Sequence, residues 1–289
     1  MAMKTVNSLS GGKTSSYLAV HYPADYNIFS LVRTEDKNCM FPDDKVRQIV
    51  SDKIGKEFIG TLEDDMIITT MLDLEQFTGQ KIHWLSGNTF DDVIKSKGKN
   101  SVQYIPNPSM RFCTVEMKIK PLAQWCYENT DLPIEMRVGF RANETRRGKN
   151  MLDKCINGIE PFKFKIGTHP NGNNKWKEMP YRKPSFPLID NGIYKDSIIE
   201  YWKDKPVRFA KFNNCVGCFH QDPLLLKHRS TENPTKFDWF IKQEEEGMEQ
   251  YKNRLWNKKV SYKDIKNHKS QIDMFDDDFN ECDSGYCGL

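Results

Sequence analysis

The chain has 289 residues, of which 38% are apolar and 29% are charged, so it can bury one large core or two modest ones. Its 43 lysines and arginines against 40 aspartates and glutamates leave a formal net charge of +3, which excludes a uniformly basic binder of phosphate backbones. The start does not resemble a signal peptide, and no window approaches the roughly 18 apolar residues of a membrane span. We therefore expect a cytoplasmic protein without a membrane partner.

The first half of the chain alternates short apolar runs with amphipathic stretches of helical length. The runs typical of buried strands are residues 5–9, 28–32, 58–60, 82–85 and 134–139. The stretches with helical periodicity are residues 14–21, 43–54, 64–77, 90–97 and 114–127. This alternation predicts an α/β fold with a Rossmann-like, doubly wound and mostly parallel sheet.

The second half is more polar and less periodic. Residues 167–187 are rich in Asn, Gly, Pro and Lys, which predicts a long loop or hairpin, and a helix follows from Tyr194 to Lys203. We expect an α/β domain over residues 1–221 and a C-terminal helical extension over residues 222–289.

Two charge runs of opposite sign lie in this extension. Residues 252–269 are rich in Lys and Arg, whereas residues 273–289 contain acids and no Lys or Arg. One interpretation is a solvated helical face followed by a frayed terminus. The other is a nucleic-acid partner, with Trp256 and Tyr262 stacking on bases between the cations.

A glycine pair marks the junction between the first predicted strand and the first predicted helix. Glycines let the backbone approach an anion, and the N–H groups and dipole of a helix N-terminus attract it. Lys13 adds a full positive charge, and we expect one neighbouring hydroxyl to cap the helix. The residues of this predicted phosphate loop are Ser10, Gly11, Gly12, Lys13, Thr14 and Ser15. The alternative is an ordinary capped turn.

The loop Ser-Gly-Gly-Lys-Thr-Ser resembles the pyrophosphate loop, Ser-Gly-Gly-x-Asp-Ser, of the adenine nucleotide alpha hydrolase superfamily. That superfamily contains the ATP pyrophosphatases and the phosphoadenosine phosphosulfate (PAPS) reductases. Thr14 stands where the family has its Asp. The resemblance implies an adenine nucleotide as substrate, either ATP with Mg²⁺ or an adenylyl sulfate.

Two further segments resemble the PAPS reductase family. Residues 139–147 resemble its Gly-x-Arg-x-x-Glu-Ser-x-x-Arg segment, which implies that Arg141, Glu144 and Arg146 contact the nucleotide. Arginine is suited to bidentate phosphate or sulfate contacts, and a salt-bridged surface loop is the alternative. Residues 33–44 loosely resemble the family's segment beside the adenosine, which adds Thr34.

Among the eight cysteines, three lie in segments that resemble the cluster-binding segments of the family. Cys113 occupies the first place of the tandem pair in Cys-Cys-x-x-x-Lys-x-x-Pro-Leu, and Cys215 and Cys218 form the distal Cys-x-x-Cys. The resemblance implies a 4Fe-4S cluster, and tetrahedral zinc is the alternative.

Such a centre takes four ligands, so a fourth is needed. We choose Cys155 because it follows the arginine segment, and Cys39 and Cys126 stay open as alternatives. Cys126 is better explained as an inert thiol on the buried face of a helix.

The terminal Cys287-Gly288-Leu289 resembles part of the Glu-Cys-Gly-Leu-His tail that carries the reductases' nucleophilic cysteine. The implied enzyme is an oxidoreductase or a sulfurtransferase, with Lys13, Arg141 and Cys287 as catalytic residues and a thiol reductant or sulfur donor as partner. Two alternatives stay open. One is ATP-dependent adenylation and thiolation of a nucleic acid, and the other is a non-catalytic, zinc-stabilised nucleotide-binding module.

Overall fold

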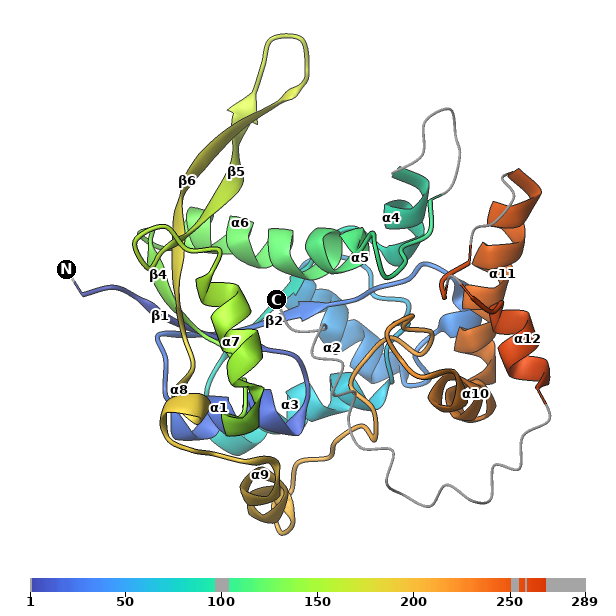
Figure 1. The fold of residues 1–289 in the computed structure, drawn as a ribbon, viewed down its shortest axis with the longest axis horizontal. Coiled ribbons are helices and arrows are strands. Elements are labelled where there is room, and N and C mark those ends of the chain that lie inside the picture. The colour runs from blue at the N-terminus through green and yellow to red at the C-terminus, as the bar shows by residue number, and fades with distance from the viewer. Residues whose placement is uncertain (1, 97–103, 251–254, 258, 269–289) are drawn as a thin grey trace. The chain divides into compact units, whose positions relative to one another are not determined.

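The computed structural model describes residues 2–96, 104–250, 255–257 and 259–268 (Figure 1). The chain forms two compact units, each assembled from segments distant in sequence. The first unit comprises Met1–Ser30, Met66–Leu85 and Ile119–Phe209. The second unit comprises Leu31–Asp65, Ser86–Lys118 and Ala210–Leu289.

A six-stranded sheet with the order β3-β2-β1-β4-β6-β5 organises the chain. The strands are β1 (Thr5–Leu9), β2 (Tyr26–Leu31), β3 (Ile82–Ser86), β4 (Ile134–Arg137), β5 (Glu160–Thr168) and β6 (Asn174–Ser185). Strand β1 is parallel to β2 and β4, β4 is parallel to β6, and only the β5–β6 hairpin is recorded as antiparallel among the described pairs. The expected α/β fold with a mostly parallel sheet is confirmed.

One expected strand is absent from the sheet. Residues 58–60 do not form a strand, and Gly60 makes only isolated bridges with Thr34 and Met40. The polar region 167–187, expected as a loop or hairpin, contains the turn and long second strand of the β5–β6 hairpin, which extends as a two-stranded arm (Figure 1).

The helices of the first unit are α1 (Lys13–His21), α3 (Met66–Thr78), α6 (Lys120–Asn129), α7 (Thr145–Leu152), α8 (Pro187–Asp190) and α9 (Lys195–Trp202), with a short 3-10 turn η3 (Ala142–Glu144) before α7. Four of them, α1, α3, α6 and α9, lie where the periodicity predicts a helix, whereas α7 and α8 are not predicted by it. The indole N–H of Trp202 donates to the Lys13 carbonyl over 3.0 Å, which ties α9 to the start of α1.

The second unit is mainly helical. Its elements are η1 (Lys37–Cys39), α2 (Asp44–Ile54), α4 (Phe90–Ser96), α5 (Phe112–Thr114), the π-helical turn η2 (Val115–Ile119), α10 (Pro223–Glu232), α11 (Pro234–Gln250) and α12 (Tyr262–Asn267). Local signals set the ends of these helices. Asp43 caps α2 by accepting from the amides of Lys45 and Val46, and Gly55 ends it in the left-handed conformation.

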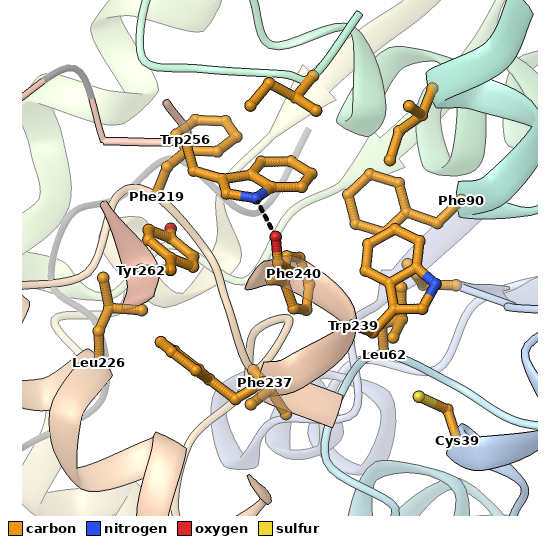
Figure 2. Close-up of a cluster of buried hydrophobic side chains, with 14 of the residues drawn as sticks. Cys39, Leu62, Phe90, Phe219, Leu226, Phe237, Trp239, Phe240, Trp256 and Tyr262 are labelled. Atoms are coloured by element: carbon orange, nitrogen blue, oxygen red, sulfur yellow. Dashed lines mark hydrogen bonds between the residues drawn. The ribbon is translucent and has the colours of Figure 1, made fainter. Parts of the chain in front are cut away.

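Aromatic side chains fill the core of the second unit (Figure 2). The indole N–H of Trp256 donates to the Phe240 carbonyl over 2.9 Å, and the Glu244 carboxylate accepts from the backbone amides of Trp256 and Tyr262. Trp256 and Tyr262 are both fully buried. The interpretation of these two rings as platforms for nucleic-acid bases is therefore wrong.

Side chains of α10, α11 and α12, together with Trp256, share this aromatic core with Leu62 and Phe90, which come from the first third of the chain. The expected boundary between residues 221 and 222 stays a prediction. No helix in the described part of the chain is long and apolar enough to cross a membrane.

Candidate functional site

The predicted phosphate loop connects β1 to α1 in the first unit. Gly11 has φ +80°, and a Cβ at this position would lie 2.5 Å from Cγ2 of Ile67. Gly12 is the N-cap of α1, and no side chain caps the helix. Only glycine fits position 11, because both the backbone conformation and the neighbouring side chain exclude a Cβ.

Two loop hydroxyls brace the loop rather than cap the helix. Ser15 Oγ donates to the Gly12 carbonyl and accepts from the Ser10 amide, both over 3.1 Å, and it lies 3.1 Å from Ser10 Oγ. The expectation of a hydroxyl cap is therefore wrong. Amides in the first turn of α1 receive no side-chain cap, so the positive end of the helix dipole faces the loop.

Lys13 stands at the first position of α1 with a half-buried side chain. Its carbonyl is held by Trp202, whereas its ammonium makes no hydrogen bond or ion pair recorded with the described residues. A cation at this position is available to a phosphate at the helix N-terminus.

The arginine segment lies beside the loop. A Cβ at Gly139, just after β4, would lie 3.4 Å from Cα of Ser15 and 3.5 Å from Cγ2 of Thr14. The structure therefore brings the predicted phosphate loop and the residues 139–147 together at the carboxyl ends of β1 and β4. Ligands of open α/β sheets bind at such an edge.

Within this segment, Glu144 holds two guanidinium groups. The Arg141 amide and Nε donate to Oε2 of Glu144 over 2.8 and 3.0 Å, and Arg147 Nη1 donates to Oε1. Burial would raise the pKa of Glu144, but the Arg141 amide and both guanidiniums outweigh it and lower that pKa. Arg141 is buried and Arg146 is exposed, so Arg146 presents the more accessible cation.

Thr34 belongs to the second unit. Its hydroxyl donates to Oδ2 of Asp91 over 2.8 Å, and its amide donates to the Gly60 carbonyl over 3.0 Å. These bonds give Thr34 a structural role, and its contact with a nucleotide stays a prediction.

Three predicted metal ligands line one cavity in the second unit. Cys113 comes from α5, and Cys215 and Cys218 come from the loop before α10. Glu63 and His220 line the same cavity, which the spacing of the cysteines alone did not indicate. Burial and the charge of Arg111 lower the pKa of His220 to about 4.

Tight contacts hold the loop between the two cysteines. The Val216 amide donates to the Leu62 carbonyl over 2.8 Å, and the Cys218 amide donates to the Cys215 carbonyl over 3.0 Å. A Cβ at Gly217 would lie 2.4 Å from Cγ of Phe240, and Tyr262 Oη donates to the Gly217 carbonyl over 3.0 Å. Phe240 of α11 and Tyr262 of α12 thus contact the Cys-x-x-Cys loop and fix its position.

The other cysteines differ from these three. Cys155 lies in the first unit, where its thiol donates to the Met151 carbonyl over 3.6 Å, so its role as fourth ligand stays a prediction. Burial raises the pKa of Cys39 and of Cys126 to about 12, as expected for inert core thiols. Cys287 lies outside the described residues, so its catalytic role stays a prediction.

The cavity lining combines thiols and an imidazole with charged groups of both signs. Glu63 Oε2 is buried without a hydrogen-bond partner among the described residues, and its Oε1 accepts from Lys118 over 2.7 Å. Arg229 of α10 is fully buried beside the Cys-x-x-Cys loop, with Nε and Nη1 meeting no acceptor in the described part of the chain. No three Cys, His, Asp or Glu side chains in the described part of the chain converge as a preformed metal site.

Comparison of the chain with protein-family models, with curated proteins and with solved structures finds no match.

Proposed function

We propose that the chain is an enzyme of the PAPS reductase family, in the adenine nucleotide alpha hydrolase superfamily. Its sheet is then the Rossmann-like, doubly wound sheet of that superfamily, and residues 222–289 are a helical extension of it. The enzyme binds ATP or an adenylyl sulfate and carries out sulfur chemistry beside a 4Fe-4S cluster.

The observation that carries this proposal is the contact between the two nucleotide motifs. Gly139 lies against Ser15, which places the arginine segment beside the N-terminus of α1. The phosphates of the nucleotide then lie over the uncapped amides of α1, with Lys13 and Arg146 as counter-cations. Glu144 positions Arg141 from the other side.

Cys113, Cys215 and Cys218 hold the cluster in this proposal, and Cys155 is the fourth ligand. The cluster supplies redox-active iron. The three thiols on one cavity and the buried cation of Arg229 support this assignment, because thiolate ligation leaves a net negative charge that a buried cation stabilises.

Two reactions fit these groups. In the reductive version, the Cys287 thiolate attacks the sulfur of an adenylyl sulfate, an S–S bond forms, and the S–O bond to the nucleotide breaks. A thiol reductant then releases sulfite. In the transfer version, an acceptor oxygen attacks the α-phosphorus of ATP, pyrophosphate leaves into the loop of residues 10–15, and a sulfur donor displaces the adenylate.

The decisive experiment is a nucleotide-binding panel on anaerobically purified protein, with Lys13→Ala as the variant and Lys195→Ala, a lysine that is likewise half-buried and lies at the start of α9, as the control. We expect the Lys13 variant to lose about tenfold or more in affinity for ATP or adenylyl sulfate with an unchanged unfolding temperature, because it removes a charge that faces the phosphate. Equal affinities in the wild type and both variants would refute the nucleotide site.

One observation favours a nucleic acid as the acceptor in the transfer version. On the β5–β6 arm, Trp176 is 49% exposed and pairs across the strands with exposed Lys165, while Lys175 and Lys177 flank it in sequence. Lys120 lies 5.8 Å from the centre of the same ring. An exposed aromatic ring among cations suits stacking on unpaired bases.

This second candidate is tested with a fluorescent single-stranded RNA and the wild type, Trp176→Ala and Trp256→Phe. The arm variant should bind at least about fivefold more weakly, and affinity should fall as salt rises. The buried-ring variant should bind like the wild type, and equal binding by all three proteins would exclude the arm.

A further inference from the structure

Arg229 is a buried cation whose hydrogen-bonding capacity is largely unused. The side chain is 0% exposed, and only Nη2 has a recorded acceptor, the Asn214 carbonyl at 3.2 Å. Nε and Nη1 meet no acceptor in the described part of the chain. An unpaired buried guanidinium is strongly unfavourable, so a structure that keeps one needs a compensating anion.

The surroundings of Arg229 indicate where that anion lies. Burial lowers the pKa of Arg229, while the negative charges of Asp64 first, then of Cys215, Cys218 and Glu232, oppose that shift. Its acceptor residue, Asn214, directly precedes Cys215 and lines the same cavity as the three thiols. On its apolar side the guanidinium lies 5.3 Å from the centre of the Phe212 ring. The unused N–H groups therefore belong to the environment of the Cys-x-x-Cys loop.

We infer that Arg229 is the internal counter-cation of a thiolate-ligated metal centre held by Cys113, Cys215 and Cys218. This inference rests on the metal centre of the proposed function. In the loaded protein, Nε and Nη1 would be available to the ligand thiolates, while Nη2 donates to the Asn214 carbonyl directly before Cys215. Arg229 thus acts through the ligands as a positioning residue, and it comes from α10, outside the segments that resemble the family.

Arginine suits this role better than lysine. Its planar group can donate to a backbone carbonyl through one nitrogen and to sulfur through the others, and its charge persists after burial. Lys227, two residues earlier on α10, is only half-buried and donates to the Lys266 carbonyl. It provides a control in which the same charge is removed from the same helix away from the thiols.

The first test compares wild type, Arg229→Met, Arg229→Lys and Lys227→Met after anaerobic reconstitution with iron and sulfide. Iron and sulfide per chain and the rate of iron loss to a chelator are measured. We expect Arg229→Met to weaken iron retention by about 10- to 100-fold, as is usual when an outer partner of a metal ligand is removed. Arg229→Lys should lie between, and Lys227→Met should match the wild type.

A second readout separates this role from simple packing. Removing the cation should make the midpoint potential of the bound cluster more negative, because adding an electron then costs more. In the metal-free protein, Arg229→Met should lower the unfolding temperature less than in the metal-loaded protein, because only the loaded centre adds the anion that the cation offsets. Replacing a structural arginine would instead lower that temperature equally with and without metal.

The outcomes distinguish the inference from the proposed function. Equal iron retention and potential in wild type and Arg229→Met overturn the inference alone. A wild type that binds zinc with an affinity that depends on Arg229 supports the inference and replaces the cluster. A wild type that retains neither iron nor zinc overturns both the cluster and the role of Arg229.

Discussion

A methyl group added at Gly217 should destabilise the second unit through a single steric conflict. The added Cβ would lie 2.4, 2.6 and 2.7 Å from Cγ, Cδ2 and Cδ1 of Phe240. Carbon atoms in contact are normally about 3.5–4.0 Å apart, so the ring must retreat by roughly 1 Å. Phe240 is 1% exposed, and its ring centre is 5.0 Å from that of Trp239 and 5.2 Å from that of Trp256, which leaves it little space.

Overpacking of this kind costs about 1–3 kcal/mol, so Gly217→Ala should lower the free energy of unfolding by that amount. The assay is urea unfolding of the metal-free protein, followed by tryptophan fluorescence, in a double-mutant cycle with Phe240→Leu. Without the ring, the same methyl should cost less than about 1 kcal/mol, which gives a coupling of roughly 1–2 kcal/mol. Gly139→Ala is the control, because its Cβ would meet nothing closer than 3.4 Å. An equal loss from Gly217→Ala with and without the Phe240 ring would refute the steric explanation.

Two further predictions concern a buried carboxylate and the phosphate loop. Burial raises the pKa of Glu244 to about 7 despite the amide bonds from Trp256 and Tyr262. The native protein then holds a proton that the unfolded chain has released between pH about 4.5 and 7. The unfolding free energy should therefore fall by roughly 3 kcal/mol as pH rises through that window, and Glu244→Gln should remove this part of the pH profile. If the unfolding free energies of wild type and variant differ by the same amount at every pH, the prediction is wrong. Gly11→Ala should lose about 1–3 kcal/mol of stability and bind pyrophosphate at least about tenfold more weakly by calorimetry, because the left-handed φ and the Ile67 contact both oppose a Cβ; wild-type affinity would contradict the assignment of this loop.

The strands of the parallel sheet could be predicted because they are buried. Residues 5–9 form β1 with the same bounds as the apolar run, since Val6 and Leu9 are enclosed on both faces of the sheet. The run 58–60 is also apolar, but a Cβ at Gly60 would lie 1.9 Å from the Cys39 carbonyl oxygen. The backbone of this loop packs closely against the loop around Cys39 instead of forming the continuous hydrogen bonds of a β-strand. No local sequence pattern predicts this packing.

The β5–β6 arm could be predicted only as a loop or hairpin. Its strands carry Pro161, Pro180 and Pro184, which cannot donate to a ladder and ordinarily indicate a break. Much of the arm is exposed, so its side chains do not alternate between apolar and polar. Residues 182–185 of β6 pair with β4, and this tertiary contact stabilises a strand that local sequence propensity does not predict.

The sequence suggested part of the candidate site through its resemblance to a family. Cys113, Cys215 and Cys218, which that resemblance groups, line one cavity, and their role as ligands stays a prediction. Arg229 could not be predicted in the same way, because its surroundings come from residues distant in sequence. The prediction for Trp256 was wrong because the cations beside it in sequence suggest a surface, whereas its ring is buried and its amide donates to Glu244 on α11.

The interleaving of the two units has a consequence for the order in which the chain can fold during synthesis. The first unit has all its segments once residue 209 has emerged from the ribosome, whereas the second unit needs residues 210–268 to close its aromatic core. Until then Leu62 and Phe90 lack their packing partners on α11 and α12. The cavity that Cys113 lines is also incomplete, because the loop with Cys215 and Cys218 has not yet been synthesised. Assembly of the second unit therefore comes late in synthesis and depends on contacts between segments distant in sequence, a kind of contact that forms slowly.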